Sequence, residues 1–449
     1  MESRAVNTIF TFKDYTIDKK SNSFKFIYSL DKFDEQFTFI EELVFPKKIQ
    51  WSKVDKKALD AAVKSLHLIL GISYWKTFCP KRIEIADYSL TPEQAKFWDK
   101  VYKLGLGEFF YQNRIDFRGL INFPVSARRP RTTHYKLHTS NKSLLLFGGG
   151  KDSLVSLELL KKHKFNFTPL IVVPTARLKL AKKIAPPKSM IVLRQLDPQL
   201  TALNTRKDVY NGHVPVSAVF AFVGELTAIL YGLRYVIASN ERSSNYGNVK
   251  YLGEEANHQW SKSIEFERIM QNYASKYINP GITYFSLLRS LYEIKIAEIF
   301  SKYTKYLRKF SSCNRAIKIW EQTGKLNWCG VCPKCAFVFT ILIPFVSKNK
   351  LVSIFGKNLL ADRTLVPLYK ELLGISRFKP FECVGAPEEV KFALHKAVES
   401  GHYANDAVIK ALLKEPRFLK PLSKIQEKEI TGVSSEHLRP YEFKRIKEI

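Results

Sequence analysis

Three consecutive glycines followed by a lysine, an aspartate and a serine give this sequence its clearest chemical feature. The run reads Phe147-Gly148-Gly149-Gly150-Lys151-Asp152-Ser153, and it lies between an apolar stretch typical of a strand and a pattern typical of a helix. Glycines let backbone N–H groups approach an anion closely, and the N-terminus of a following helix adds partial positive charge. The order therefore predicts a phosphate-binding loop.

Two widespread glycine loops do not fit this run. A Walker A loop needs a glycine where Leu145 stands and a serine or threonine after the lysine, where Asp152 stands instead. A dinucleotide-binding fingerprint needs a third glycine at the position of Ser153. An ordinary glycine-rich turn before a helix is the remaining structural interpretation.

Four of the six cysteines lie within residues 313–335, which indicates a metal site in a reducing compartment. Cys329, Cys332 and Cys335 are separated by two residues each, and Cys313 lies sixteen residues before Cys329. Four thiolates satisfy tetrahedral zinc in a closed structural site, and an iron–sulfur cluster is a second possibility. Two alternatives stay open. The cysteines could be unpaired core residues, or Cys313 could be a catalytic thiol, which would leave three ligands.

The elements that would position these residues follow from the hydrophobic pattern. Residues 8–46 alternate apolar and polar in short runs, which predicts a small antiparallel sheet. Residues 55–70 change to helical spacing, and Thr91-Pro92 is typical of the start of a second helix. The polar, basic stretch 124–142 resembles a linker.

An α/β pattern follows this linker. We expect strands at 143–147, 168–173, 190–193 and 233–238, with helices at 153–163 and 213–231. Such alternation predicts an α/β fold with a parallel sheet and helices on both faces. We therefore divide the chain into a small α+β N-terminal domain (1–135), a catalytic domain (140–385) and a basic helical C-terminal tail (386–449).

Composition limits the class of protein and of partner. The chain has 449 residues and a formal net charge of +30, a balance that attracts polyanions or substrates with several negative charges. The N-terminus lacks the apolar region of a secretory signal. Charged residues interrupt the apolar stretch 216–238, and the stretch 337–346 is too short to span a bilayer. We expect a cytoplasmic protein without a membrane partner.

The glycine run resembles the PP-loop of ATP pyrophosphatases, Ser-Gly-Gly-x-Asp-Ser. Gly148 replaces the first serine, and the other positions match. The resemblance implies a PP-loop ATP pyrophosphatase-like parallel sheet with flanking helices. It also implies ATP and Mg²⁺ as cofactors, with Gly148, Gly149, Gly150, Lys151, Asp152 and Ser153 holding the pyrophosphate. In that family an acceptor oxygen attacks the α-phosphorus, and the loop with Lys151 stabilises the leaving pyrophosphate.

A second set of motifs narrows the resemblance to the MurL family of bacterial UDP-N-acetylmuramoyl-L-alanyl-L-glutamate epimerases. It extends over roughly residues 8–390, and its motifs are Phe147–Ser153, Asn211–Val216, Ser239–Asn245, Glu255–Ser263, Ser312–Asn314, Trp328–Cys335 and Lys379–Gly385. The resemblance implies an isomerase of peptidoglycan precursor synthesis. It would invert the terminal L-glutamate of UDP-MurNAc-L-Ala-L-Glu through an acyl-adenylate, converting ATP to AMP and diphosphate.

Polar motifs after the predicted strands are the candidate substrate-binding residues. Arg242 suits a carboxylate or phosphate, and Glu241 is a candidate magnesium ligand. The full candidate set is His213, Glu241, Arg242, Asn245, Asn257, His258, Gln259, Ser261 and Lys262. His213 could instead cap or pack the helix that we expect it to open.

The proton transfer at the α-carbon needs a base near neutral pKa on each face. His213, His258, Glu382 and Cys383 are candidates, and we name His258 and Cys383 together with Lys151 and Asp152 as the catalytic residues. The zinc ligands would be Cys313, Cys329, Cys332 and Cys335.

Two other functions remain as alternatives. A tRNA-modifying ATP pyrophosphatase would fit the charge and the cysteines, although nucleic acid is not the partner that we expect. A zinc-stabilised nucleotide-binding regulator would bind ATP without turning it over.

Overall fold

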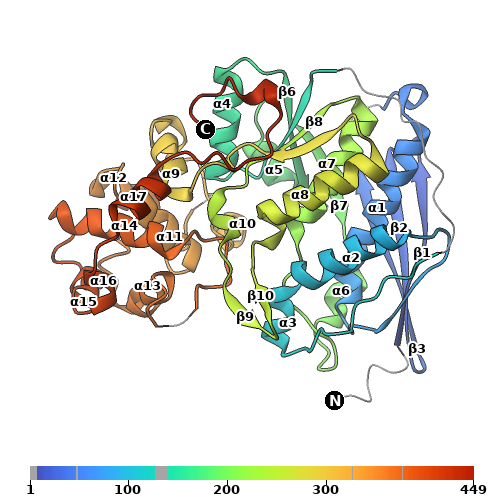
Figure 1. Ribbon diagram of the computed structural model, residues 1–449, viewed down its shortest axis with the longest axis horizontal. Coiled ribbons are helices and arrows are strands. Elements are labelled where there is room, and N and C mark those ends of the chain that lie inside the picture. The colour runs from blue at the N-terminus through green and yellow to red at the C-terminus, as the bar shows by residue number, and fades with distance from the viewer. Residues whose placement is uncertain (1–7, 47–48, 127–139, 326, 377) are drawn as a thin grey trace.

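Nine strands form one continuous mixed sheet, with β1–β3 at the edge of the molecule opposite the C-terminal helices (Figure 1). The computed structural model describes residues 8–46, 49–126, 140–325, 327–376 and 378–449. The strand order is β11-β8-β5-β6-β7-β3-β2-β1-β4. The strands are Thr8–Asp18 (β1), Ser23–Lys32 (β2), Glu35–Val44 (β3), Arg82–Ile85 (β4), Ser143–Leu146 (β5), Phe167–Val173 (β6), Met190–Gln195 (β7), Tyr235–Ala238 (β8) and Thr283–Ser286 (β11). A separate short hairpin pairs Val249–Tyr251 (β9) with Glu254–Ala256 (β10).

The helices lie on both faces of the sheet and in a C-terminal group. The longer ones before β11 are Lys56–Trp75 (α1), Pro92–Gly105 (α2), Gly107–Asn113 (α3), Lys151–Lys162 (α4), Leu178–Ile184 (α5), Pro198–Leu203 (α6), Val216–Tyr231 (α7) and Ile264–Tyr273 (α8). The later ones are Glu293–Ser301 (α9), Ala316–Thr323 (α10), Pro333–Leu342 (α11), Lys348–Phe355 (α12), Val366–Leu372 (α13), Pro387–Glu399 (α14), Ala407–Leu412 (α15), Pro416–Leu419 (α16) and Lys424–Thr431 (α17). In Figure 1 the helices from α11 to α17 gather on one side of the molecule, away from β1–β3, and the red C-terminal end of the chain runs back beside α4 and β6.

The two faces of the sheet bury two separate cores because successive strand residues point to opposite faces. Leu144 of β5 belongs to the core that includes residues of α1, α7 and α8, whereas the adjacent Leu145 belongs to the core that includes residues of α4, α9 and α11. Val236 and Ile237 of β8 divide in the same way. This division confirms the predicted arrangement of an α/β sheet with helices on both faces.

The N-terminal strands continue the α/β sheet. β1, β2 and β3 pair antiparallel as the alternation predicted, and β3 then pairs antiparallel with β7 through residues 42–44. The strands β11, β8, β5, β6 and β7 pair in parallel. The division into domains at 135–140 stays a prediction, and part of the expected linker, 127–139, lies outside the described residues.

Most predicted elements are confirmed, with two shifted helix starts. The Thr91 hydroxyl caps α2 in a capping box with Gln94, and Pro92 stands at its first position. The helix after the glycine run begins at Lys151 rather than Ser153. The prediction that His213 opens a helix was wrong, because Pro215 precedes α7, which begins at Val216. A proline fits a helix start because it has no N–H to leave unpaired.

Candidate active site

The glycine loop follows β5, where the order of the parallel strands reverses. β6 and β7 extend the sheet on one side of β5, and β8 and β11 extend it on the other. In open α/β sheets, ligands bind outside the carboxyl ends of the strands at such a switch point. The segments that follow β5, β8 and β11 should therefore contribute to one site.

The loop backbone has a conformation that depends on glycine at two positions. Gly149 has a positive φ of 78°, a conformation that residues with a Cβ rarely adopt. Gly150 is the N-cap of α4, and a Cβ there would lie 3.0 Å from the Ser312 hydroxyl. The Ser153 hydroxyl donates to the Gly150 carbonyl at 3.0 Å. The segment that precedes the N-terminus of α4 therefore carries no side chains that would block access to the first N–H groups of the helix.

Three carboxylates from the segments that follow three strands meet beside this helix start. Asp152 follows β5, Glu241 follows β8, and Glu293 begins α9 after β11. Ligand oxygens of the three lie within 4.8 Å of one another. Carboxylate oxygens are the protein ligands that Mg²⁺ prefers, so this donor set fits a magnesium ion. Among the described residues, none donates a hydrogen bond to the buried Glu241 carboxylate.

Lys151 neutralises part of this carboxylate group. Its buried ammonium forms ion pairs with Asp152 and Glu293. Burial alone would lower the pKa of Lys151, but the two carboxylates outweigh it and raise the pKa. The pKa of Glu293 is raised by burial and by the nearby Asp152. The lysine is therefore cationic and held at the N-terminus of α4.

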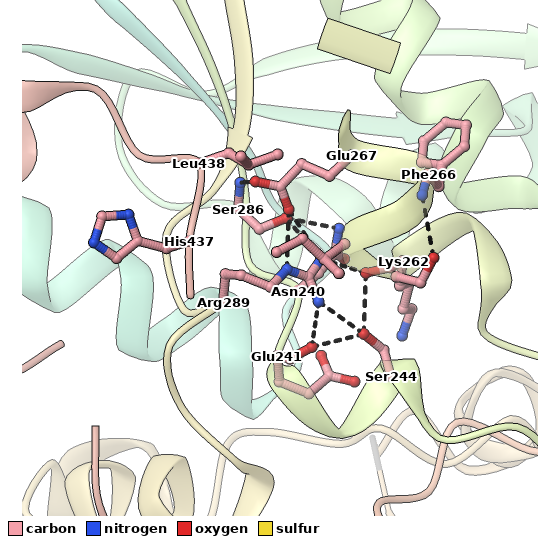
Figure 2. Close-up of polar contacts among 12 residues, drawn as sticks. Asn240, Glu241, Ser244, Lys262, Phe266, Glu267, Ser286, Arg289, His437 and Leu438 are labelled. Atoms are coloured by element: carbon pink, nitrogen blue, oxygen red, sulfur yellow. Dashed lines mark hydrogen bonds and ion pairs between the residues drawn. The ribbon is translucent and has the colours of Figure 1, made fainter. Parts of the chain in front are cut away.

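A buried arginine holds the backbone that carries two of these residues. Figure 2 shows Arg289 among the segments that contain Glu241, Lys262 and Glu267. Its Nε donates to Glu267 Oε2 at 3.0 Å, one terminal nitrogen donates to the Glu241 carbonyl at 2.6 Å, and the other donates to the Lys262 carbonyl. The side chain is fully buried. Arg289 thus fixes the loops from which the Glu241 and Lys262 side chains project.

Cys383 lies next to the carboxylate group, with Lys262 between them. Lys262 Nζ lies 3.4 Å from Cys383 Sγ, and the same lysine interacts electrostatically with Glu241 and Asp152. Burial alone would raise the pKa of the Cys383 thiol, but Lys262 and His258 lower it to about 5. Cys383 is therefore a thiolate at neutral pH, which is the nucleophilic and basic form of cysteine.

His258 interacts with Cys383 and with Glu108, an acidic residue that the sequence analysis did not predict. Its Nδ1 lies 2.5 Å from Glu108 Oε2, and the imidazole also hydrogen-bonds to Cys383. Burial would lower the pKa of His258, but Cys383 and Glu108 raise it to about 9. The imidazole of His213 packs beside it with ring centroids 4.5 Å apart, and burial together with the neighbouring His258 lowers the pKa of His213 to about 3.

The remaining predicted residues hold the loops in place. Asn245 Oδ1 accepts from the Ile264 amide at 2.9 Å, Asn257 donates to the Ser244 carbonyl at 2.9 Å, and Gln259 donates to the Val384 carbonyl at 2.9 Å. Ser261 is buried in the short helix before Lys262. These contacts tie residues 240–264 to one another and to the segment of Cys383. Substrate binding by these residues stays a prediction.

Two predicted residues point to other partners. Arg242 donates to Ser434 Oγ at 2.6 Å and pairs with Glu436 at 3.0 Å, so its guanidinium binds the C-terminal tail. Glu382 accepts a hydrogen bond from Asn314 at 2.5 Å, and burial raises its pKa. The structure does not bring Arg242 together with the carboxylate group.

Several residues of the site were not predicted from the sequence. Glu108 lies in α3 and Glu293 in α9, both far in sequence from the glycine loop. Lys334 pairs with Glu293 at 3.9 Å and donates to the Cys383 carbonyl, and the buried Lys379 donates to the Tyr246 carbonyl at 2.8 Å. The one signal available was that Lys334 and Lys379 lie within recognised motifs. Single acidic residues on amphipathic helices carry no such signal.

The four clustered cysteines meet in a separate, largely buried group. Their sulfur atoms all lie within 4.8 Å of one another, and the contacts Cys313–Cys332, Cys329–Cys335 and Cys332–Cys335 measure 3.8, 3.6 and 3.5 Å. Zinc–sulfur bonds of about 2.3 Å place tetrahedral sulfurs about 3.8 Å apart. The arrangement fits a closed zinc site, and Cys313 lies within the group of four thiols; zinc binding by the four stays a prediction.

Comparisons with known proteins agree over nearly the whole chain. Residues 1–287 match the MurL N-terminal domain model, and residues 309–425 match the MurL C-terminal domain model. A protein of Xanthomonas oryzae named UDP-N-acetyl-alpha-D-muramoyl-L-alanyl-L-glutamate epimerase is 35% identical over 96% of this chain and 95% of its own length. Proteins of the same name from Micromonospora sp. and Salinispora tropica are 35% and 33% identical, each over 90% of this chain and over 90% and 88% of their own lengths.

Proposed function

The chain belongs to the MurL family of epimerases, and on that premise we propose that it inverts the terminal L-glutamate of UDP-N-acetylmuramoyl-L-alanyl-L-glutamate to D-glutamate. It is an enzyme of the isomerase class. The reaction would consume ATP, with AMP and diphosphate as products, through an acyl-adenylate. The product is a precursor of peptidoglycan.

The chemistry explains why an epimerase would use ATP. Removal of the α-proton of a free carboxylate places a second negative charge beside the first. Adenylation of that carboxylate removes the first charge and makes the carbonyl ester-like, so the carbanion is delocalised as an enolate. Protonation on the other face and hydrolysis of the adenylate then give the inverted amino acid.

The glycine loop and the carboxylate group support the adenylation half of this proposal. Gly148, Gly149 and Gly150 precede the N-terminus of α4, which favours binding of a diphosphate. Lys151 is positioned to stabilise the charge of the leaving pyrophosphate. A magnesium ion held by Asp152, Glu241 and Glu293 would neutralise phosphate oxygens.

Cys383 and His258 support the proton-transfer half. As a thiolate, Cys383 would take the α-proton and become a thiol, and His258 as an imidazolium would deliver a proton to the opposite face of the carbanion. The direct hydrogen bond between the two groups would be replaced by the α-carbon of the bound substrate. Transfer of the proton from the Cys383 thiol to the His258 imidazole then restores both groups.

The observation that carries the proposal is the convergence of these two halves. Lys262 lies between Cys383 and the carboxylates, so the phosphate site and the candidate base share one lysine. An acyl-adenylate joins a phosphate to the carbonyl next to the α-carbon. The phosphate site and the base that removes the α-proton must therefore lie side by side. The net charge of +30 also suits a substrate with a diphosphate and two carboxylates.

The alternative of a tRNA-modifying ATP pyrophosphatase is not favoured. Both domain models and the three relatives carry the name of an epimerase family, and none of them names RNA. Among the described residues, no helix is long and apolar enough to cross a bilayer.

Incubation of the dipeptide substrate in deuterium oxide tests the proposal. With ATP and Mg²⁺ we expect D-glutamate by chiral analysis, deuterium at the α-carbon, and AMP. An α,β-methylene analogue of ATP should support neither exchange nor inversion. Asp152→Asn should abolish AMP formation, whereas Asp116→Asn, at an exposed Arg118 pair, should retain it. Deuterium uptake without ATP would contradict the adenylate mechanism.

A further inference from the structure

We propose that Glu108, contributed by the N-terminal part of the chain, is a positioning residue that orients His258 toward Cys383 and completes a Glu108–His258–Cys383 line. This inference rests on the proposed function only for its consequence in catalysis. The arrangement itself is testable on the free enzyme, through the chemistry of the Cys383 thiol.

The contacts place His258 between two anionic groups. Glu108 Oε2 lies 2.5 Å from Nδ1, and the imidazole also hydrogen-bonds to Cys383. A protonated imidazole has two N–H donors on opposite sides of the ring, so one ring can serve both partners at once. The acid fixes the ring orientation, as the third member of a nucleophile–base–acid set does in other enzymes.

Close packing of α2 and α3 brings Glu108 to this position. A Cβ at Gly107 would lie only 3.3 Å from the Ala256 Cα, so α3 approaches the segment that leads into His258 closely enough that a side chain at position 107 would be crowded. A Cβ at Gly105 would lie 2.9 Å from the Pro215 ring, which closes the same packing against the segment of His213. Glu108 stands in the first turn of α3, directly after these two glycines.

The surrounding charges make Glu108 necessary for a cationic His258. The charged and titratable groups that interact with the Cys383–His258 pair are Lys262, Lys334, Lys379, His213, Glu382 and Glu108. Three of them are lysines, which oppose a further positive charge. Glu382 is engaged with Asn314, so Glu108 is the carboxylate in direct contact with the ring.

The adjacent histidine gives an internal comparison. His213 Nδ1 lies 3.5 Å from the same Glu108 oxygen, beyond the 2.5 Å contact that His258 makes. The two rings are similarly buried and lie side by side, yet the pKa of His213 is lowered to about 3 while that of His258 is raised to about 9. The direct contacts with Glu108 and Cys383 account for the difference.

A metal ion is the competing interpretation of this cluster. Glu108, His213 and His258 each offer a ligand atom within 4.8 Å of the others. Nitrogen and oxygen ligands of tetrahedral zinc at about 2.1 Å lie roughly 3.4 Å apart, however, and a 2.5 Å contact between Glu108 and His258 is a direct hydrogen bond. The geometry favours the ion pair.

Alkylation of Cys383 by iodoacetamide, followed by peptide mass spectrometry from pH 5 to 9, tests the inference. In the wild type we expect the rate to stay nearly constant between pH 8 and 6, because the thiolate persists. In Glu108→Gln the amide still accepts a hydrogen bond but carries no charge. We expect its rate at pH 6 to fall at least tenfold relative to its rate at pH 8, with the deuterium-exchange rate reduced at least tenfold. Glu254→Gln, at the exposed pair with Lys103, is the matched control and should behave as wild type.

Each other outcome bears on the inference. An unchanged alkylation profile in Glu108→Gln would overturn it, as would protection of wild-type Cys383 by zinc added beyond the one equivalent expected at the four-cysteine site, if that protection is lost in Glu108→Gln. If Glu108→Gln does not fold, Glu108→Asp takes its place, because it keeps the charge on a shorter side chain. Its alkylation profile should lie between those expected for the wild type and for Glu108→Gln. A profile identical to that of the wild type would contradict the positioning role. The expected profiles in an enzyme that forms no D-glutamate would refute the proposed function and leave the ion pair standing.

Discussion

Replacement of Arg289 by methionine should destabilise the protein more than any surface substitution. Arg289 is fully buried and pairs with Glu267 at 3.0 Å, and it also donates to the carbonyls of Glu241 and Lys262. Arg289→Met keeps much of the apolar volume but leaves the Glu267 carboxylate buried. Loss of one partner of a buried ion pair costs about 3–5 kcal/mol.

A double variant separates the charge effect from the loss of the carbonyl contacts. In Arg289→Met with Glu267→Gln, the stranded charge is removed, and the glutamine oxygen can still accept from the Ser286 amide, which lies 3.0 Å from Glu267 Oε1. The carbonyls of Glu241 and Lys262 lose the arginine donors and share the single proton of the Ser244 hydroxyl, so one of the two is left unsatisfied, at about 1–3 kcal/mol. The double variant should therefore recover part of the loss and remain less stable than the wild type.

Urea denaturation followed by tryptophan fluorescence and circular dichroism gives the comparison. The shift in midpoint multiplied by a shared slope yields the free-energy difference between variants. Arg268→Met, at an exposed position of α8 directly after Glu267, is the control and should lie within about 0.5 kcal/mol of the wild type. A loss below about 1 kcal/mol in Arg289→Met, or no recovery in the double variant, would refute the role of a buried charge pair.

Three further predictions follow from other buried groups. Elemental analysis of the purified protein should find about one zinc per chain. Cys332→Ser should lose this zinc and unfold at a lower temperature, whereas the control Cys79→Ser should retain it. Finding iron with sulfide would contradict a zinc site. Burial raises the pKa of Glu225 to about 8, so between pH 4.5 and 8 the folded protein holds a proton that the unfolded chain releases. The free energy of unfolding should therefore fall as pH rises through this window, by up to about 1.4 kcal/mol per pH unit. Glu225→Gln should remove this dependence in denaturation curves, and parallel curves for the two proteins would show that Glu225 is not responsible. Phe443→Ala should cost about 3–5 kcal/mol and increase hydrogen exchange in residues 434–449, because the buried ring stacks on Phe165 at 4.5 Å; unchanged exchange would contradict this packing.

Local pattern was sufficient to predict the elements of the fold. The alternation in residues 8–46 gives β1–β3 because one face of these strands packs on α1, and the Thr91-Pro92 pair starts α2 as expected. Pattern does not specify which strands become neighbours. The pairing of β3 with β7 depends on the packing of distant segments, so a separate N-terminal sheet was the natural expectation from sequence alone.

The candidate site divides in the same way between local and distant information. The glycine loop, Lys262 and Cys383 stand in recognisable motifs, and the structure places them together. Glu108 and Glu293 are single acids on helices, and only the tertiary arrangement distinguishes them from surface carboxylates. Arg242 shows the converse, because a residue type suited to phosphate binds Glu436 instead.

The arrangement of charges explains why the site draws on the whole chain. The N-terminal part supplies Glu108 to His258, the loops after β5, β8 and β11 supply the three carboxylates, and the tail supplies Glu389, which accepts from the Ile294 amide next to Glu293. Buried like charges repel strongly, at about 4 kcal/mol for a pair 4 Å apart at an effective dielectric constant of 20. The lysines between them offset this repulsion only if every segment is in register. A thiolate beside three carboxylates is thus tenable because separate parts of the chain fix the intervening cations, and loss of any one part should disturb the site as a unit.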